Sequence, residues 1–200
     1  MFGCAVLTGV GAALNAAAIA PGDSVAVFGL GGVGLAALLG AVYAGGRVVA
    51  VDRVAEKLEL AQELGAEWTL PADADVVENV QETTDGGAMH VIETVGNAAV
   101  LAQAYRATRR GGTTVTVGLP HPEQQLSIPA VSLVAEERCL KGSYLGSCIP
   151  ERDIPRYIEL YRSGRLPVDR LLSHRLTLED LNDGFDRLAQ GEGVRQVVLL

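Results

Sequence analysis

Short apolar runs alternate along this chain with longer segments of helical periodicity. Continuous apolar runs of four or five residues predict buried strands, and apolar positions spaced three and four residues apart predict helices. Glycine and proline mark the boundaries between these segments. The pattern predicts strands at 24–28, 48–51, 68–70, 89–95 and 113–117, with a sixth at 139–145, and helices at 5–18, 35–43, 55–64, 75–83 and 98–107.

This alternation of strand and helix predicts an α/β fold. The expected architecture is a doubly wound parallel sheet with right-handed crossovers, the Rossmann arrangement. Ligands of such sheets bind at the carboxyl ends of the strands. Gly29, Asp52, Val95 and Gly118 all fall at such ends, so we expect a binding site there.

The pattern changes after residue 145. Asp153 is expected to cap a helix that stops at Gly164, and a strand is expected at 171–176. Thr177 and Asp180 are typical of a capping box that opens another helix, with Leu181, Phe185 and Leu188 on one face. A terminal strand is expected at 195–200. Because these elements bury little surface alone, we assign 146–200 to a second, incomplete domain.

Composition narrows the possible partners and location. Hydrophobic residues make up 48% of the chain, which supports a core, and the net charge of −8 disfavours nucleic acid. The cysteines at 4, 139 and 148 suggest no disulfide framework, so we expect a cytoplasmic protein. Cys139 is expected in the core, and no role is assigned to Cys148. The three histidines are expected in loops or on the surface.

The first 22 residues carry no charge, and the first basic residue is Arg47. A secretory signal needs a basic segment near its start, and alanine and glycine make this stretch too weakly apolar to span a membrane. We therefore predict a helix packed against the sheet and no membrane association.

A glycine-rich turn gives the strongest indication of chemistry. Gly29, Gly31 and Gly34 form a G-x-G-x-x-G motif directly after one predicted strand, and Asp52 ends the next. The glycines suit a tight turn, close approach of a pyrophosphate and close packing of helix on strand. Asp52 lies 18 residues beyond Gly34, near the spacing of about 20 for an acid that accepts ribose hydroxyls. The unit predicts a nicotinamide dinucleotide site.

Other interpretations of this turn stay open. A methyltransferase also uses a glycine loop and an acid, and the turn could be purely structural. Asp52 could cap the turn after its strand without touching a ligand. Lys57 could be a solvated helix charge, and Arg195 could pair with Glu192.

Motifs along nearly the whole chain resemble the C-terminal part of zinc-dependent medium-chain alcohol dehydrogenases. They are Gly3-Cys4 with Thr8-Gly9, the 27–34 segment, Val51-Asp52, Glu93-Thr94-Val95-Gly96, Val117-Gly118 and Gly191-Glu192-Gly193-Val194-Arg195. The resemblance implies a dinucleotide-binding Rossmann domain at 1–145 and, at 146–200, the C-terminal part of an incomplete catalytic domain.

The resemblance also implies residue roles, with NAD as the cofactor. Cys4 matches one ligand of the catalytic zinc, and Thr8 matches a residue near the nicotinamide ring. Asp52 and Lys57 match residues on the adenosine ribose, beside which Arg53 departs from the common pattern. The implied cofactor-binding residues are Thr8, Gly29, Gly31, Gly32, Val33, Gly34, Asp52, Arg53, Lys57, Val95, Val117, Gly118, Leu119 and Arg195.

In such enzymes zinc holds the substrate oxygen while hydride passes between an alcohol or aldehyde and NAD. A catalytic zinc needs about three protein ligands, and Cys4 is the single position that matches one. The resemblance places the others in an N-terminal domain. We therefore expect the 200 residues to bind NAD without turnover. The substrate is expected to be a small alcohol or aldehyde.

Two further interpretations remain. The chain could be a non-catalytic NAD-binding module or truncated gene product, or a relative of zinc-free quinone or enoyl reductases, against which Cys4 and Asp52 both count. Family members commonly pair through the last strand of the sheet, which implies a homodimer near 139–145. Leu133, Val134 and Leu140 are expected to form its apolar seam.

Overall fold

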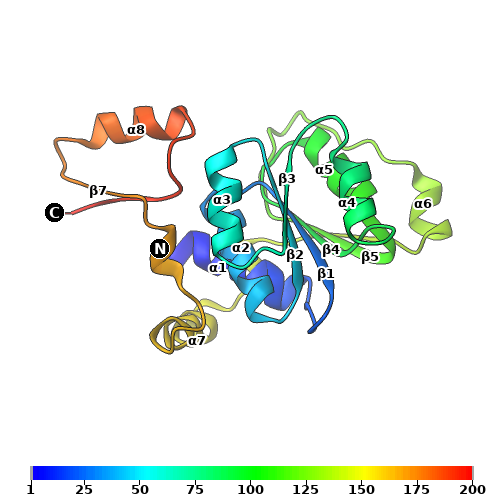
Figure 1. The fold of residues 1–200 in the computed structure, drawn as a ribbon, viewed down its shortest axis with the longest axis horizontal. Helices are drawn as coiled ribbons and strands as arrows, with labels where there is room; N and C mark the ends of the chain where they lie inside the picture. Colours follow the sequence, from blue (N-terminus) through cyan, green and yellow to red (C-terminus); the bar gives the residue numbers. More distant parts are fainter. Residues whose placement is uncertain (1, 200) are drawn as a thin grey trace.

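A computed structural model describes residues 2–199 of the protein (Figure 1). Six parallel strands form one sheet in the order β3-β2-β1-β4-β5-β6, which confirms the predicted doubly wound α/β fold. The order reverses between β1 and β4, the point at which such sheets bind ligands. The strands are β1 (Ser24–Phe28), β2 (Arg47–Asp52), β3 (Trp68–Pro71), β4 (Ala88–Glu93), β5 (Thr108–Thr116) and β6 (Cys139–Gly142).

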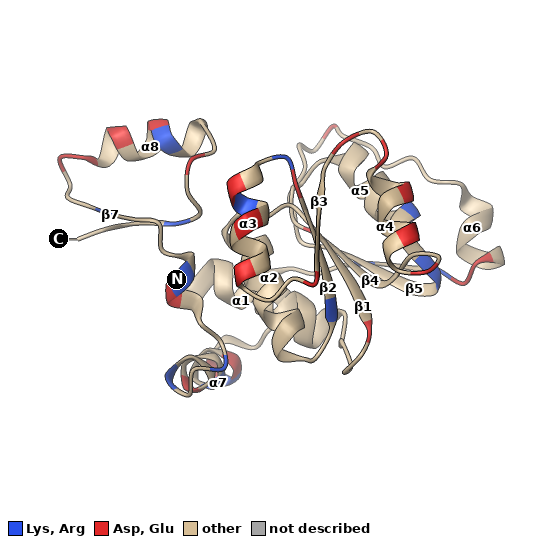
Figure 2. Ribbon diagram, viewed as in Figure 1, with Lys and Arg blue, Asp and Glu red and all other residues tan. Residues whose placement is uncertain are grey.

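Helices cover both faces of the sheet. Val25 and Val27 of β1 pack on one side and Ala26 and Phe28 on the other, as the two-residue period of a strand requires. The first side is covered by α2 (Gly32–Tyr43) and α3 (Ala55–Glu63), and the second by α4 (Val76–Thr83) and α5 (Ala98–Ala107). Figure 2 shows charged residues on α3 and α4, Glu and Lys on α3 and Glu alone on α4, whereas α2 carries none.

The N-terminal helix forms and is buried, as predicted. It runs through a π-helical turn (Phe2–Val6), α1 (Leu7–Gly11) and a second π-helical turn (Ala12–Ala16). Gly9 lies so close to α2 that a β-carbon there would overlap the Val33 carbonyl oxygen. None of the helices within residues 2–199 has the length and apolar character needed to cross a membrane.

Two strands differ from the predicted bounds for local reasons. β4 ends at Glu93 rather than residue 95 because the Glu93 side chain accepts hydrogen bonds from the N–H groups of Val95 and Gly96 and turns the chain. β5 begins at Thr108 rather than 113, since the expected turn at Gly111 lies inside the strand at a shift of register against β4.

β6 is the edge strand of the sheet. It follows α6 (Ala130–Ala135) in the chain and ends at Gly142 rather than 145. Cys139 is exposed, so its predicted place in the core is wrong. The error arises because an edge strand has a neighbour on one side only.

The C-terminal segment begins with a short turn (Leu145–Ser147), α7 (Pro150–Arg162) and a second turn (Val168–Leu171). Tyr157 and Leu160 of α7 join the cluster that contains α1 and α2. The prediction that Asp153 caps α7 is wrong, because the helix begins at Pro150 with Ile149 as its N-cap. Asp153 lies inside the helix, fully buried, and its Oδ2 accepts a hydrogen bond from the Ile149 N–H at 2.9 Å.

The segment ends in a separate parallel pair, β7 (His174–Leu176) and β8 (Gln196–Val198), with α8 (Leu181–Ala189) between them. The predicted capping box opens the helix at Thr177, whereas α8 begins at Leu181 with Asp180 as its N-cap. The Thr177 hydroxyl donates a 2.8 Å hydrogen bond to the Asp180 carboxylate. Phe185 and Leu188 are about half exposed. The division into domains at 145 and 146 stays a prediction.

Candidate functional site

The glycine turn joins β1 to α2 at the carboxyl edge of the sheet. Gly29 has a φ of 89°, which favours glycine, and a β-carbon on Gly34 would overlap the Gly29 carbonyl oxygen. α2 begins at Gly32, three residues earlier than predicted, with Gly31 as its N-cap. A helix start leaves backbone N–H groups free and carries a positive dipole end, both of which suit a phosphate.

The position of Gly31 is open. A β-carbon there would meet no atom within 4 Å in the described part of the chain, and the φ of −73° suits any residue. Packing within the chain therefore gives no reason for glycine at this position. Room for a closely approaching ligand does, so the turn fits the pyrophosphate of a dinucleotide.

Asp52 lies at the end of β2 and is tied to the glycine turn. Its Oδ2 accepts a hydrogen bond from the Leu30 N–H at 2.6 Å, and its Oδ1 accepts one from the Val54 N–H at 3.0 Å. Asp52 therefore caps the turn after its strand. A carboxylate has about four acceptor sites, so two remain for ribose hydroxyls. The ribose contact stays a prediction.

A pocket of about 480 Å³ lies between α3 and the segment that precedes β8. Lys57 lines it from α3, and Gly191 to Val194 line it from the other side. The carbonyl oxygen of Val194 is 3.7 Å from where a β-carbon of Gly32 would lie. The structure thus brings the closing motif beside the glycine turn, although 162 positions separate Gly32 from Val194. Arg53 is exposed and Arg195 is partly buried.

The loops after β4 and β5 complete this edge. A methyl of Val95 lies 2.7 Å from where a β-carbon of Gly29 would be, and Gly118 lies against the backbone of Gly96. Val95 and Leu119 remain exposed, at 52% and 81% of their surface, and Val117 is half-buried. Thr8 is 92% buried in α1. These residues are the predicted nicotinamide side, and their roles stay predictions.

Sequence reasoning gave Glu93 no role, yet it holds these loops. Its side chain is 1% exposed, and Oε1 accepts hydrogen bonds from the N–H groups of Val95 and Gly96, both at 2.7 Å. Its Oε2 accepts one from the Thr116 hydroxyl at 2.7 Å. An acid that ends a buried strand, three residues before a glycine, is the signal that could have indicated this role.

A family described as zinc-binding dehydrogenase matches residues 32–163, about two thirds of this sequence. The chain belongs to this family. A geraniol dehydrogenase of Castellaniella defragrans is 38% identical to it over 98% of the chain and 53% of the relative. White clover (Trifolium repens) alcohol dehydrogenase 1 is 36% identical, over 98% and 52%. The chain therefore spans about half the length of the curated relatives it matches.

Solved structures agree with this assignment. A benzyl alcohol dehydrogenase of Acinetobacter calcoaceticus superposes with a TM-score of 0.95 at 31% identity, covering 98% of this chain and 55% of that one. The fold of this zinc-binding dehydrogenase chain is therefore that of about half of its solved relative.

The described residues of this zinc-binding dehydrogenase chain do not fit a zinc site. Between residues 2 and 199 no group of three His, Cys, Asp or Glu side chains is placed to hold a metal. Cys4 is exposed at the start of the first helix, and its role as a zinc ligand position stays a prediction. His90 lies in β4, where its Nε2 is 3.1 Å from Asp23 Oδ2. Its side chain is 12% exposed, so the expectation of a loop or surface residue is wrong for His90.

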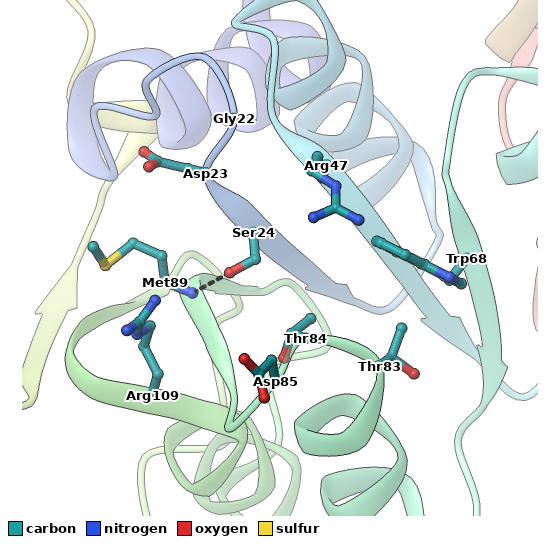
Figure 3. A pocket seen from close by; sticks show the side chains of 10 residues that line it. All are labelled: Gly22, Asp23, Ser24, Arg47, Trp68, Thr83, Thr84, Asp85, Met89 and Arg109. Atoms are coloured by element: carbon teal, nitrogen blue, oxygen red, sulfur yellow. Dashed lines mark hydrogen bonds between the residues drawn. The ribbon is translucent and has the colours of Figure 1, made fainter.

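A second cavity, of about 420 Å³, lies at the opposite edge of the sheet, where β1 and β2 begin (Figure 3). Ser24 Oγ accepts a hydrogen bond from the Met89 N–H at 3.0 Å, and Arg47 stacks over the Trp68 ring at 4.9 Å. Asp23 and Asp85 line it with Arg47 and Arg109. Both signs of charge are present, so the cavity selects no class of ion.

Proposed function

We propose that this chain binds NAD at the carboxyl edge of its sheet and forms the cofactor-binding part of an alcohol dehydrogenase. The observation that carries the proposal is the hydrogen bond between Asp52 and Leu30, which holds an acid beside a turn fitted to a pyrophosphate. In this arrangement the adenosine ribose lies by Asp52 and Lys57. The pyrophosphate lies at the start of α2 with Arg195 reaching it, and the nicotinamide lies by Val95 and Leu119.

NAD, when bound, supplies the carbon that accepts or donates hydride. The chain's own residues bind and orient it. The free N–H groups at the start of α2 hold the pyrophosphate, and the apolar side chains of Val95, Val117 and Leu119 exclude water from the nicotinamide face. Asp52 disfavours a 2′-phosphate through charge repulsion, so NAD is preferred to NADP even with Arg53 beside it.

The substrate proposed for the complete enzyme is a small alcohol or aldehyde. The named relatives support this class, because they are a geraniol, an alcohol and a benzyl alcohol dehydrogenase. We propose no individual substrate. Because the described residues do not form a zinc site, we derive no step through zinc and propose that these 200 residues alone do not turn over an alcohol.

Two finer proposals concern assembly and location. We propose a homodimer that forms through the edge strand β6 and the exposed apolar side chains of α6. We also propose a cytoplasmic location, which the three unpaired cysteines support.

Titration of the purified chain with NAD and NADP by isothermal calorimetry tests the proposed function. NAD should bind at least about tenfold more tightly than NADP, because the 2′-phosphate of NADP would face the carboxylate of Asp52. Metal analysis and an alcohol-dependent assay of NADH production should be carried out on the same sample. No binding of either cofactor would overturn the proposal, and NADH production would overturn the claim of inactivity.

A further inference from the structure

Glu93 is a buried carboxylate at the centre of the candidate site. It ends β4, next to β1 at the point where the strand order reverses. Burial of a charged group costs free energy unless hydrogen bonds compensate it. Here three donors reach it, two backbone N–H groups and the Thr116 hydroxyl, each at 2.7 Å.

These bonds fix two loops that a ligand would contact. Val95 and Gly96 lie two and three residues beyond the end of β4, and both donate to the same oxygen of Glu93, so the chain must turn sharply there. The bond from Thr116 ties this turn to β5, one residue before Val117. Gly96 in turn lies against Gly118 and Leu119. Glu93 therefore sets the position of the loops on both sides of the predicted nicotinamide face.

A second link joins this unit to the glycine turn. The Thr94 hydroxyl donates to the carbonyl oxygens of Phe28 and Gly29, at 3.1 and 3.0 Å. The β4 loop is therefore anchored independently to the part of the site that would hold the pyrophosphate. Loss of the Glu93 bonds should loosen the nicotinamide side and leave the pyrophosphate side in place.

We propose that Glu93 is a positioning residue for the nicotinamide half of the cofactor. It acts through Val95, Gly96 and Thr116. This inference rests on the proposed function, since it assumes that a dinucleotide binds at this edge. It goes beyond that function because it assigns to one buried acid the positioning of the loops that contact nicotinamide, separately from the residues that bind the rest of NAD.

Binding of NAD and of ADP-ribose to Glu93→Ala tests the inference. ADP-ribose keeps the adenosine ribose and the pyrophosphate but lacks nicotinamide. Loss of hydrogen bonds to a buried charged group should weaken NAD binding about tenfold and change ADP-ribose binding less than about twofold. Glu93→Gln should restore most of the NAD affinity. Its amide oxygen still accepts hydrogen bonds from the two N–H groups, and its amide NH2 can donate to the Thr116 hydroxyl oxygen. Glu123→Ala removes an exposed glutamate and should change neither affinity.

Equal weakening of both ligands by Glu93→Ala would overturn the inference and make the role of Glu93 purely structural. Unchanged affinities for both would overturn it as well. If Glu93→Ala does not fold, Thr116→Val carries the test, with about threefold weaker NAD binding and unchanged ADP-ribose binding expected. Binding of neither ligand by the unsubstituted protein would overturn the proposed function itself, a result distinct from all of these.

Discussion

Gly34 lies so close to Gly29 that a β-carbon on residue 34 would overlap the carbonyl oxygen of residue 29. The contact joins the first turn of α2 to the end of β1. Gly31, between them, faces open space instead. Packing within the chain therefore requires glycine at residue 34, and at residue 31 the requirement is the one we propose, room for a ligand.

Gly34→Ala and Gly31→Ala should separate these demands. The first should lower the free energy of unfolding by about 2 kcal/mol or more, since backbone must shift to admit the methyl group. The second should cost less than about 1 kcal/mol and weaken NAD binding at least about tenfold by blocking the pyrophosphate. Urea unfolding and calorimetry measure the two effects. Equal stability losses would contradict this division.

Cys148 should react slowly with alkylating reagents. Burial raises the pKa of its thiol, so little of the reactive thiolate is present at pH 8. Its Sγ also accepts a hydrogen bond from Asn15 Nδ2 at 3.2 Å. Cys4 and Cys139 are exposed. Peptide mass spectrometry after iodoacetamide treatment should show Cys148 modified at least about tenfold more slowly, a difference that urea should abolish. Equal rates in the folded protein would refute this.

The buried acid of α7 should make stability depend on pH. Hydrogen bonds from the Arg152 side chain lower the pKa of Asp153 below its ordinary value. The folded state therefore gains stability above the pKa of the unfolded chain, about 4, and loses it as pH falls through the lower folded pKa. Asp153→Asn should cost about 1–3 kcal/mol at pH 7, and this difference should shrink below about pH 4.

Glu159→Gln is the matched control on the same helix. Glu159 pairs with Arg162, and both side chains are 69% exposed. Exposed pairs contribute little, so its substitution should change stability by less than about 0.5 kcal/mol at any pH. If the two variants lose stability equally at pH 7, the role assigned to Asp153 is wrong.

The dimer proposal depends on the apolar side chains of α6. Val134 and Leu133 are 82% and 41% exposed there, and Leu140 is half-buried in β6. Sedimentation equilibrium should give the dimer mass, and Val134→Glu should shift it toward the monomer. Leu178→Glu, at an exposed position three residues before α8, should have no effect, because α8 lies at the opposite end of the molecule from α6 (Figure 1). Monomer at high concentration would contradict the proposal.

The first half of the fold could be predicted closely because its signals are local. The run before Gly29, the glycine turn and the run ending at Asp52 each carry their own pattern, and the structure places all three in one unit. The closing motif at 191–195 reaches the same site through tertiary packing. Its place there followed from the family resemblance rather than from periodicity.

The errors concern residues whose surroundings the sequence pattern does not reveal. Asp153 is of a residue type that often caps helices, but α7 begins three residues earlier, at Pro150, and the Asp153 side chain is buried inside the helix. Cys139 lies in a predicted strand, but among residues 2–199 no further strand pairs with the outer edge of β6. Glu93 stands in an apolar run as an isolated acid, and its three donors appear only when the ends of β4 and β5 meet.

Calorimetric titration of NAD into Asp52→Ala tests the central claim most directly, with Asp186→Ala, an exposed position on α8, as the control. Circular dichroism must show both variants folded, since Asp52 also holds the Leu30 and Val54 N–H groups. We predict that Asp52→Ala binds NAD at least about tenfold more weakly than the unsubstituted protein. The affinity of the Asp186→Ala control should be unchanged. An affinity of Asp52→Ala for NAD equal to that of the unsubstituted protein would contradict the central claim.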